Sequence, residues 1–263
     1  MPDYKLHLGD CLEFMRSMPD RSIDAVITSP PYDNLRDYGG SYSFDFEPTA
    51  SQLYRILKDG GVVVWVVGDS SQNGSETGTS FRQALYFMDL GFNLHDTMIY
   101  ERDTMPFPEV NRYEQAFQFM FVFTKGSPKT FNPILEKTRG HVKSKYGTYR
   151  QVDGSTERSK YEVGKETRKR FNIWRYGVGY MKSTTDKEAF EHPAIFPELL
   201  ASDHINSWTD KDDTVLDCFM GSGTTGKMCM KLYRNFIGCE INPDYYAIAE
   251  KRISEAASQM VMF

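Results

Sequence analysis

The residues with the most distinctive chemistry form a corner, Thr28-Ser29-Pro30-Pro31-Tyr32, directly after the apolar run of residues 23–27. That run is rich in β-branched residues and predicts a buried strand, which two prolines end because neither can donate to a β-ladder. The Ser29 hydroxyl and the Pro30 carbonyl would then be two acceptors held close together on a stiff backbone. Tyr32 adds a flat ring that could stack on a planar heterocycle. The corner could hold an exocyclic amino group; the plainer alternative is a proline turn with an exposed tyrosine.

This corner resembles the Ser/Asp/Asn-Pro-Pro-Tyr/Phe motif of DNA methyltransferases that modify the amino nitrogen of cytosine or adenine. The resemblance implies that Ser29, Pro30, Pro31 and Tyr32 are catalytic. An aromatic amine is a poor nucleophile because its lone pair is delocalised into the ring. Two acceptors on its hydrogens would favour a pyramidal nitrogen with its lone pair directed in line at a methyl group. Catalysis would then be positional and electrostatic rather than covalent.

Further strand-like runs end in groups that could bind a small polar ligand. Asp10 and Cys11 follow the alternating run of residues 4–8, and Glu240 lies at the tip of the run of residues 235–241. The run of residues 215–220 leads into Gly221-Ser222-Gly223-Thr224-Thr225-Gly226. Glycines let the backbone approach a ligand closely, while a helix amino end and threonine hydroxyls offer donors to an anion. The ends of such strands form the ligand-binding edge of an open α/β sheet.

In the family that the corner resembles, these positions bind S-adenosylmethionine. The aspartate after the first strand contacts the adenine amino group there, and the segment His192-Pro193-Ala194-Ile195-Phe196 resembles the motif around the methionine end. An acid at the tip of the strand near residue 240 can accept from ribose hydroxyls. The cofactor-binding residues that the resemblance implies are Asp10, Cys11, His192, Pro193, Phe196, Asp217, Phe219, Gly221, Gly223, Thr224, Thr225, Glu240 and Ile241.

Charge is distributed unevenly along the chain. The 263 residues carry a net charge of -5, yet residues 125–182 hold fifteen Lys and Arg against five Asp and Glu. A basic segment in an acidic scaffold suits a polyanionic partner, although a solvated charged loop has the same composition. Cations interleaved with aromatic rings are typical of a DNA-reading segment. The basic residues expected to bind DNA are Lys143, Lys145, Arg150, Arg158, Lys160, Lys165, Arg168, Lys169, Arg170 and Arg175.

Cysteine spacing and hydropathy indicate the compartment. The four cysteines form no Cys-x-x-Cys pair and no zinc-like spacing with histidine, so we expect buried thiols in a reducing compartment and no metal site. The chain shows neither the pattern of a signal peptide nor an apolar run long enough to span a membrane. The sequence therefore predicts a soluble, cytoplasmic protein.

The order of the motifs indicates the fold. A catalytic corner, a basic segment, a His-Pro helix and a glycine motif follow each other in the circularly permuted order of the β class of DNA amino-methyltransferases. The resemblance implies an α/β, Rossmann-like class I methyltransferase with a seven-stranded, mostly parallel sheet and an antiparallel edge strand. Residues 1–126 would be the catalytic half, 127–191 the target recognition region and 192–263 the cofactor-binding half.

Other protein classes fit single motifs. The spacing Gly221-x-Gly223-x-x-Gly226, with an acid about twenty residues on, also fits the fingerprint of an NAD-dependent oxidoreductase. Fewer than forty residues follow the last of these glycines, however, and the fingerprint gives the proline corner no task. Protein-glutamine methyltransferases place their Asn-Pro-Pro-Tyr corner after the cofactor motif. An inactive DNA-binding module would not need both an intact corner and an intact cofactor loop.

The predicted activity is sequence-specific methylation of double-stranded DNA at the amino nitrogen of a flipped base, with S-adenosylmethionine as the methyl donor. Serine rather than aspartate at position 29 favours N4 of cytosine narrowly, and N6 of adenine is the alternative. Dimers occur in the class that the chain resembles. The resemblance therefore allows a homodimer. It allows either a cognate restriction endonuclease as a partner or a solitary enzyme.

Overall fold

The structure is a computed structural model that describes residues 2–31, 44–103, 111–138, 146–160 and 166–259. The predicted catalytic Tyr32 and the predicted DNA-binding Lys143, Lys145 and Lys165 lie outside these residues. The chain divides into two compact units, one made of Met1–Asn132 with Asn172–Phe263 and the other of Pro133–Phe171. Each unit is described by itself.

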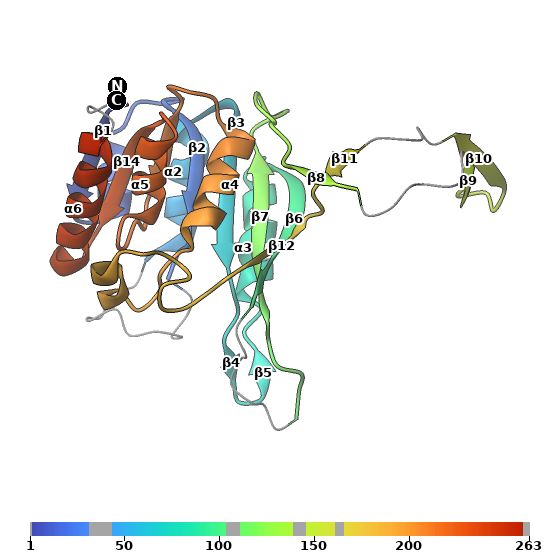
Figure 1. The fold of residues 1–263 in the computed structure, drawn as a ribbon, viewed down its shortest axis with the longest axis horizontal. Helices are drawn as coiled ribbons and strands as arrows, with labels where there is room; N and C mark the ends of the chain where they lie inside the picture. The colour runs from blue at the N-terminus through green and yellow to red at the C-terminus, as the bar shows by residue number, and fades with distance from the viewer. Residues whose placement is uncertain (1, 32–43, 104–110, 139–145, 161–165, 260–263) are drawn as a thin grey trace. The chain divides into compact units, whose positions relative to one another are not determined.

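A central sheet organises the first unit (Figure 1). Its strands are β1 (Tyr4–Leu8), β2 (Ile23–Thr28), β3 (Leu57–Val67), β6 (Asn93–Arg102), β7 (Phe117–Thr124), β12 (Ile173–Tyr176), β13 (Thr214–Asp217) and β14 (Asn235–Glu240). They are arranged in the order β1-β14-β13-β2-β3-β7-β6-β12. Neighbours pair in parallel, except that β7 is antiparallel to both β3 and β6. The predicted α/β architecture with a mostly parallel sheet is confirmed.

The sheet differs from the expectation in two details. Counted over the described residues, it has eight strands rather than seven, and its antiparallel strand lies between two others instead of at an edge. The additional strand is β12, which pairs with the outer side of β6 and buries Trp174 and Tyr176. A strand of four residues inside a basic, aperiodic segment leaves too short an apolar pattern to be recognised.

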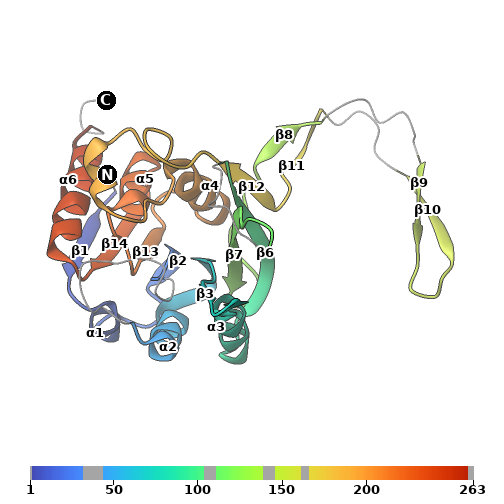
Figure 2. The same cartoon turned by 90° about the horizontal axis from the view of Figure 1, so that it is seen from below.

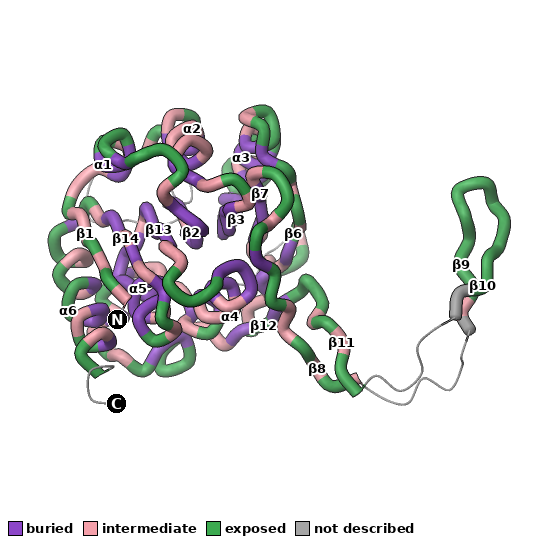
Figure 3. Tube along the Cα trace, turned by 90° about the horizontal axis from the view of Figure 1, so that it is seen from above, coloured by how far each residue is buried: buried purple, intermediate pink, exposed green. Residues whose placement is uncertain are grey.

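Helices cover both faces of the sheet, as Figure 2 shows. One face packs against α1 (Cys11–Arg16), α2 (Phe46–Ile56) and α3 (Thr79–Asp89), and the other against α4 (Glu198–Trp208), α5 (Thr224–Lys231) and α6 (Pro243–Gln259). All six residues of β2 are buried, as are the last seven of β3. Figure 3 shows this burial concentrated in the middle strands. Strands covered on both faces carry continuous apolar runs, which is why β2 and β3 were recognisable in the sequence.

Short elements complete the two units. The first unit also holds a small hairpin, β4 (Ser71–Gln72) with β5 (Ser75–Glu76), and the 3-10 helix η1 (Lys187–Glu191). The second unit consists of two antiparallel pairs, β8 (Leu135–Lys137) with β11 (Thr167–Lys169) and β9 (Tyr146–Arg150) with β10 (Thr156–Lys160). It is narrower than the expected recognition region of residues 127–191, because residues 127–132 and 172–191 belong to the first unit. Among the described residues, no helix has the length and apolar character needed to cross a membrane.

Candidate active site

A cavity lies where the strand order of the sheet reverses. The chain passes from β2 outward to β3, and from the neighbouring β13 outward in the opposite direction to β14. Open α/β sheets bind ligands at such a point, outside the carboxyl ends of the strands. A cavity of about 390 Å³ occupies this position, lined by Ser29 after β2, Asp217 of β13 and Glu240 of β14. The fold therefore gathers the predicted catalytic corner and the predicted acids around one space.

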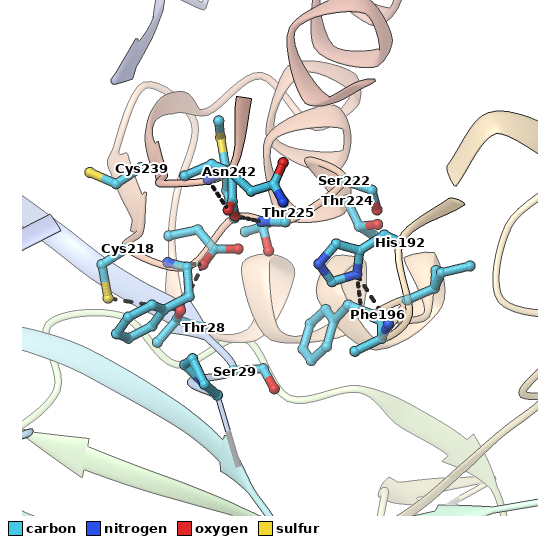
Figure 4. Close-up of a pocket in the computed structure, with 18 of the residues that line it drawn as sticks. Thr28, Ser29, His192, Phe196, Cys218, Ser222, Thr224, Thr225, Cys239 and Asn242 are labelled. Atoms are coloured by element: carbon cyan, nitrogen blue, oxygen red, sulfur yellow. Dashed lines mark hydrogen bonds between the residues drawn. The ribbon is translucent and has the colours of Figure 1, made fainter. Parts of the chain in front are cut away.

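The proline corner and the glycine-rich loop are tied to each other through Thr28. Its hydroxyl donates to Asp217 Oδ1 at 2.6 Å, and both residues are buried. Ser29 and Pro31 line the cavity, whereas Pro30 is buried and does not line it. Figure 4 shows Thr28 and Ser29 on one side of the space and Phe196 across from Ser29. The bond between Thr28 and Asp217 fixes the position of the corner relative to the loop after β13.

The two acids of the cavity differ in how they are held. Burial raises the pKa of Asp217 to about 6, although hydrogen bonds from Thr28, from Thr225 and from the Phe219 N–H oppose the shift. Burial also raises the pKa of Glu240. The Gly221 N–H donates to Glu240 Oε2 and the Asn242 N–H to Oε1, each at 2.9 Å. Because a carboxylate has about four acceptor positions, Glu240 keeps capacity for ligand hydroxyls.

Asp10 and three cysteines line the same cavity. Asp10 caps α1 by accepting from the Glu13 N–H at 2.9 Å, which fixes its carboxylate at the end of β1. Cys11, Cys218 and Cys239 are buried, and burial raises the pKa of each thiol, that of Cys11 to about 12. All four cysteines of the chain are free and buried, as expected. These thiols are protonated at neutral pH and form an apolar wall rather than a set of nucleophiles.

The glycine-rich loop is packed tightly against the protein itself. Gly221 has a φ of +50°, and a Cβ on it would lie 2.8 Å from His192 Nε2. Gly223 has a φ of +76°, and a Cβ there would lie 2.8 Å from the Ala249 Cα on α6. Both glycines are required by the left-handed backbone and by the neighbouring chain. The loop thus presents Gly221, Thr224 and Thr225 to the cavity, while Gly223 serves the packing beneath it and does not line the cavity.

The segment before α4 forms the opposite wall. His192 and Phe196 line the cavity, whereas Pro193 is not among its lining residues. The Ala194 N–H donates to His192 Nδ1 at 3.1 Å, and the ring packs edge-on against Tyr245 with centroids 4.4 Å apart. The imidazole is therefore held by its own turn and by α6. The remaining predicted residues that line the cavity are Phe219 and Ile241.

A buried ion cluster connects this segment to the glycine-rich loop. Arg252 of α6 is wholly buried and pairs with Asp186 at 2.8 Å and Glu198 at 3.2 Å. Lys227 of α5 pairs with the same two carboxylates at 2.7 Å each. Arg252 also donates to the Ser222 carbonyl oxygen in the loop. Burial alone would raise the pKa of Glu198, but hydrogen bonds from Lys227 and Thr184 bring it below its usual value. Nothing in the sequence pattern indicated this cluster.

A second set of cavity residues was also missed by sequence reasoning. Tyr100 and Arg102 of β6 and Gln118 of β7 line the cavity together with Ser29. Strand periodicity shows which of their side chains share a face but not that the face borders a site. Asp69, by contrast, follows the carboxyl end of β3 by two residues, and its carboxylate accepts from the Ser80 N–H in the first turn of α3 at 2.9 Å. It is not among the cavity residues.

The described members of the predicted DNA-binding set differ in their surroundings. Arg150 and Arg158 are exposed on β9 and β10. Arg168 and Arg170 lie 3.6 and 3.4 Å from Glu136, and Arg168 also stacks on Phe171. Arg175 belongs to β12 of the central sheet, where it lies 3.8 Å from Glu101. The structure therefore divides the predicted DNA-binding set between the two units, with Lys160 and Lys169 at the ends of β10 and β11.

Comparison with known proteins identifies the family. Residues 23–251 match the model of the N6/N4 DNA methylase family, described as DNA methylase. The orphan methyltransferase M.BamHII of Bacillus amyloliquefaciens is 54% identical over 256 residues, which cover 95% of this chain and 91% of that protein. The type II methyltransferase M.HpaI of Haemophilus parainfluenzae is 28% identical, over 95% of this chain and 74% of its own. These matches do not support the NAD-dependent alternative.

Solved structures agree on the fold. The cytosine-N4-specific PvuII DNA methyltransferase superposes with a TM-score of 0.67 at 20% identity, over 100% of this chain and 94% of the other. TTHA0409 from Thermus thermophilus, described as a DNA modification methylase and solved with S-adenosyl-L-methionine, gives a TM-score of 0.62 at 22% identity, over 97% and 96% of the two chains. With the family match spanning residues 23–251, this chain belongs to the family of DNA methylases that act on exocyclic amino groups.

Proposed function

We propose that this DNA methylase transfers a methyl group to the exocyclic amino nitrogen of a base flipped out of a specific duplex sequence, with N4 of cytosine narrowly favoured over N6 of adenine. One observation carries the proposal: the Ser29 corner and the acidic ends of β13 and β14 line a single cavity. A base held at the corner and a cofactor held by the acids would therefore meet inside it. Serine at position 29 supports the cytosine assignment.

S-adenosylmethionine, when bound, supplies an electrophilic methyl group. The lining residues fit such a molecule chemically. Glu240 would accept from the ribose hydroxyls, since two backbone N–H groups already fix its orientation. Asp10 would accept from the adenine amino group, and the segment from His192 to Phe196 would enclose the methionine end. The cofactor has both polar and apolar surface. The cavity matches it with carboxylates, an aromatic side chain at Phe196 and the backbone of Gly221.

The remaining chemistry belongs to the corner. The Ser29 hydroxyl would accept one amino hydrogen, and the Pro30 carbonyl oxygen, although Pro30 is not among the residues that line the cavity, would accept the other. Tyr32 would stack on the flipped base. Hydrogen bonding to both hydrogens would increase the electron density on the nitrogen as it attacks. The N–C bond would form as the donor's C–S bond breaks, and the surplus proton would pass by way of the Ser29 hydroxyl to solvent. Burial raises the pKa of the Cys11 and Cys218 thiols and so disfavours their thiolate forms, and the proposed transfer uses no cysteine nucleophile. Catalysis depends on positioning and electrostatics.

The partners follow from the substrate. The double-stranded DNA substrate would be bound in part by the basic segment, which we propose as the target recognition region. Arg150 and Arg158 are the described members most available to phosphates, because both are exposed on the β9–β10 pair. M.BamHII is named an orphan methyltransferase, and this supports a solitary enzyme without a cognate restriction endonuclease. A DNA substrate also suits a cytoplasmic location, and a homodimer remains an alternative to a monomer.

Product analysis tests this function. The protein is incubated with mixed-sequence duplex DNA and S-adenosylmethionine, and the DNA is digested to nucleosides for mass spectrometry. We expect N4-methylcytosine. N6-methyladenine would keep the reaction class but reverse the assignment of the base. Cofactor binding without either product would contradict DNA amino-methylation as the activity on such a pool.

A further inference from the structure

One wall of the cavity carries hydrogen-bond donors on the side away from the cofactor acids. Tyr100 and Arg102 are two residues apart on β6, so their side chains leave the same face of the sheet. Tyr100 lies directly opposite Gln118 of β7 in the antiparallel register. All three residues line the cavity with Ser29. In the sheet, β13 and β14 flank β2 on one side, and β7 and β6 follow on the other. The donor wall thus lies on the far side of the catalytic corner from Asp217 and Glu240.

The Tyr100 hydroxyl is buried without a partner. The residue is 3% exposed, and within the described part of the chain its hydroxyl makes no hydrogen bond. Arg102 Nε is likewise buried without a partner, although Nη2 of the same residue donates to the Gln115 carbonyl oxygen. Burial raises the pKa of Tyr100, so its phenol is protonated and can act as a donor at neutral pH. A buried, unpaired hydroxyl is costly to keep unless something else pairs with it.

The neighbouring tyrosine shows the usual arrangement. Tyr176 packs edge-on against Tyr100 with ring centroids 5.9 Å apart, and it is just as buried. Its hydroxyl donates to Asp203 Oδ2 at 2.6 Å. Two similar phenols therefore lie side by side, one paired inside the protein and the other lining the cavity unpaired. The contrast indicates that the partner of Tyr100 comes from the ligand.

We infer that Tyr100, with Arg102 beside it, donates a hydrogen bond to the carbonyl oxygen of a flipped cytosine whose amino group is held at Ser29. The inference rests on the proposed function and extends it to the choice of base. Along its pairing edge, cytosine presents an amino group, a ring nitrogen and then a carbonyl oxygen. Adenine presents an amino group, a ring nitrogen and then a C–H group. The Tyr100 hydroxyl, placed beyond the ring nitrogen, would be satisfied by cytosine and left unpaired by adenine.

Such a wall discriminates strongly between the two bases. A site that is built to hydrogen-bond one group rejects an analogue that lacks it, because the buried donors of the site are then left without partners. Tyr100 would accordingly be a specificity residue rather than part of the methyl-transfer chemistry at Ser29. Replacing Tyr100 should therefore reduce the dependence of the methylation rate on the carbonyl oxygen of the base. The binding of the amino group at Ser29 should be unaffected.

The experiment compares two bases in the duplex site found by sequencing DNA methylated by the wild type. One duplex carries cytosine, and the other carries a 2-aminopyridine C-nucleoside, which keeps the amino group and ring nitrogen but lacks the carbonyl oxygen. Transfer of labelled methyl groups is measured at a pH above the pKa of the pyridine nitrogen. We expect the wild type to lose about 10- to 100-fold in kcat/KM on the analogue. Equal rates on the two bases would overturn the inference without any variant.

Tyr100→Phe completes the cycle, with Tyr176→Phe as the matched control. On cytosine, Tyr100→Phe should have a kcat/KM about 10- to 100-fold below that of the wild type. On the analogue, its kcat/KM should be close to the wild-type value. Its Tm should stay at or above the wild-type value, because an unpaired buried hydroxyl has been removed. Tyr176→Phe should lower Tm and retain the preference for cytosine. Full activity of Tyr100→Phe on cytosine would overturn the inference. Wild-type formation of N6-methyladenine alone would overturn it and leave amino-methylation standing, whereas no product on either base would contradict the proposed function itself.

Discussion

At the scale of single residues, the site depends on polar groups that are buried and paired across the two halves of the cavity. The Thr28 hydroxyl donates to Asp217 at 2.6 Å, so the residue before the proposed catalytic Ser29 is tied to the strand that leads into the glycine-rich loop. The sequence predicted the proline corner and the glycine-rich loop separately. Each has a local signature after an apolar run: two prolines at the corner, and an acid followed by glycines at the loop. It could not predict their bond, which joins residues 189 positions apart.

The pKa of Asp217 gives a prediction about stability and pH. Burial raises this pKa from 3.8 to about 6, so the folded protein favours the protonated carboxyl more than the unfolded chain does. The stability that this proton contributes is present below the unfolded value and is lost as the pH rises through about 6. Relative to Asp217→Asn, the wild type should therefore gain about 1 to 2 kcal/mol in free energy of unfolding between pH 7.5 and pH 5.

Urea denaturation of both proteins at several pH values measures this difference. Other titrating groups are common to the two proteins and cancel in the comparison. A difference that is independent of pH would mean that Asp217 does not carry the raised pKa.

At the scale of elements, the sequence indicated strands and helices wherever their burial was regular. The runs of β2, β3 and β14, and the helix after the glycine-rich loop, were recognisable because each is covered on one or both faces by the rest of the first unit. Strand β12 was not, since it has four residues and depends on the neighbouring β6 for its place in the sheet. The donor wall on β6 and β7 was missed because a phenol in a strand has the same pattern whether or not a cavity adjoins it.

The buried ion cluster around Arg252 connects helices α4, α5 and α6. Arg252→Met would leave Asp186 and Glu198 with Lys227 alone and would free the Ser222 carbonyl of the glycine-rich loop. Because removing one partner of a buried ion cluster leaves uncompensated charge, we expect the free energy of unfolding to fall by about 3 kcal/mol. Binding of S-adenosylmethionine should also weaken, since the loop is no longer anchored.

Lys251→Met is the matched control for this variant. Lys251 is the preceding residue of the same helix and pairs with Glu188 on the surface, where its side chain is 58% exposed. Exposed ion pairs contribute little to stability, so the control should unfold and bind the cofactor as the wild type does. Equal effects of the two variants in denaturation and titration would show that the buried cluster has no particular role.

At the scale of the whole molecule, charge separates the protein into an acidic scaffold and a basic region that we propose contacts DNA. Net charge is -5, yet the basic residues gather in residues 125–182. The sequence predicted this asymmetry directly, because charge needs no fold to be counted. It could not show that Arg168 and Arg170 lie beside Glu136, or that Arg175 belongs to the central sheet. Arg150 and Arg158 are therefore better candidates for phosphate contacts.

The pair on the β9–β10 hairpin can be tested through the salt dependence of binding. Arg158 lies opposite Thr148, and Arg150 lies opposite Thr156, which places both arginines on one face of the hairpin. The double variant Arg150→Glu/Arg158→Glu should weaken binding to duplex DNA and reduce the slope of log K against log salt by about 2. Fluorescence anisotropy over a range of salt concentrations measures that slope.

Lys211→Glu/Lys231→Glu is the control, because it changes the net charge equally at two exposed positions on the amino-end side of the sheet. Its slope should stay at the wild-type value. If both double variants change the slope to the same extent, binding responds to total charge and the hairpin does not contact DNA.

The central claim is that the Ser29 corner activates a DNA amino group for methyl transfer. It is tested most directly by the rate of methylated nucleoside formation on duplex DNA, measured by mass spectrometry for the wild type and for Ser29→Ala, with S-adenosylmethionine binding measured separately. We predict N4-methylcytosine from the wild type, and a rate about 100- to 1,000-fold lower from Ser29→Ala with cofactor binding retained. Equal rates from the two proteins would contradict the role of the corner and, with it, the account of the site.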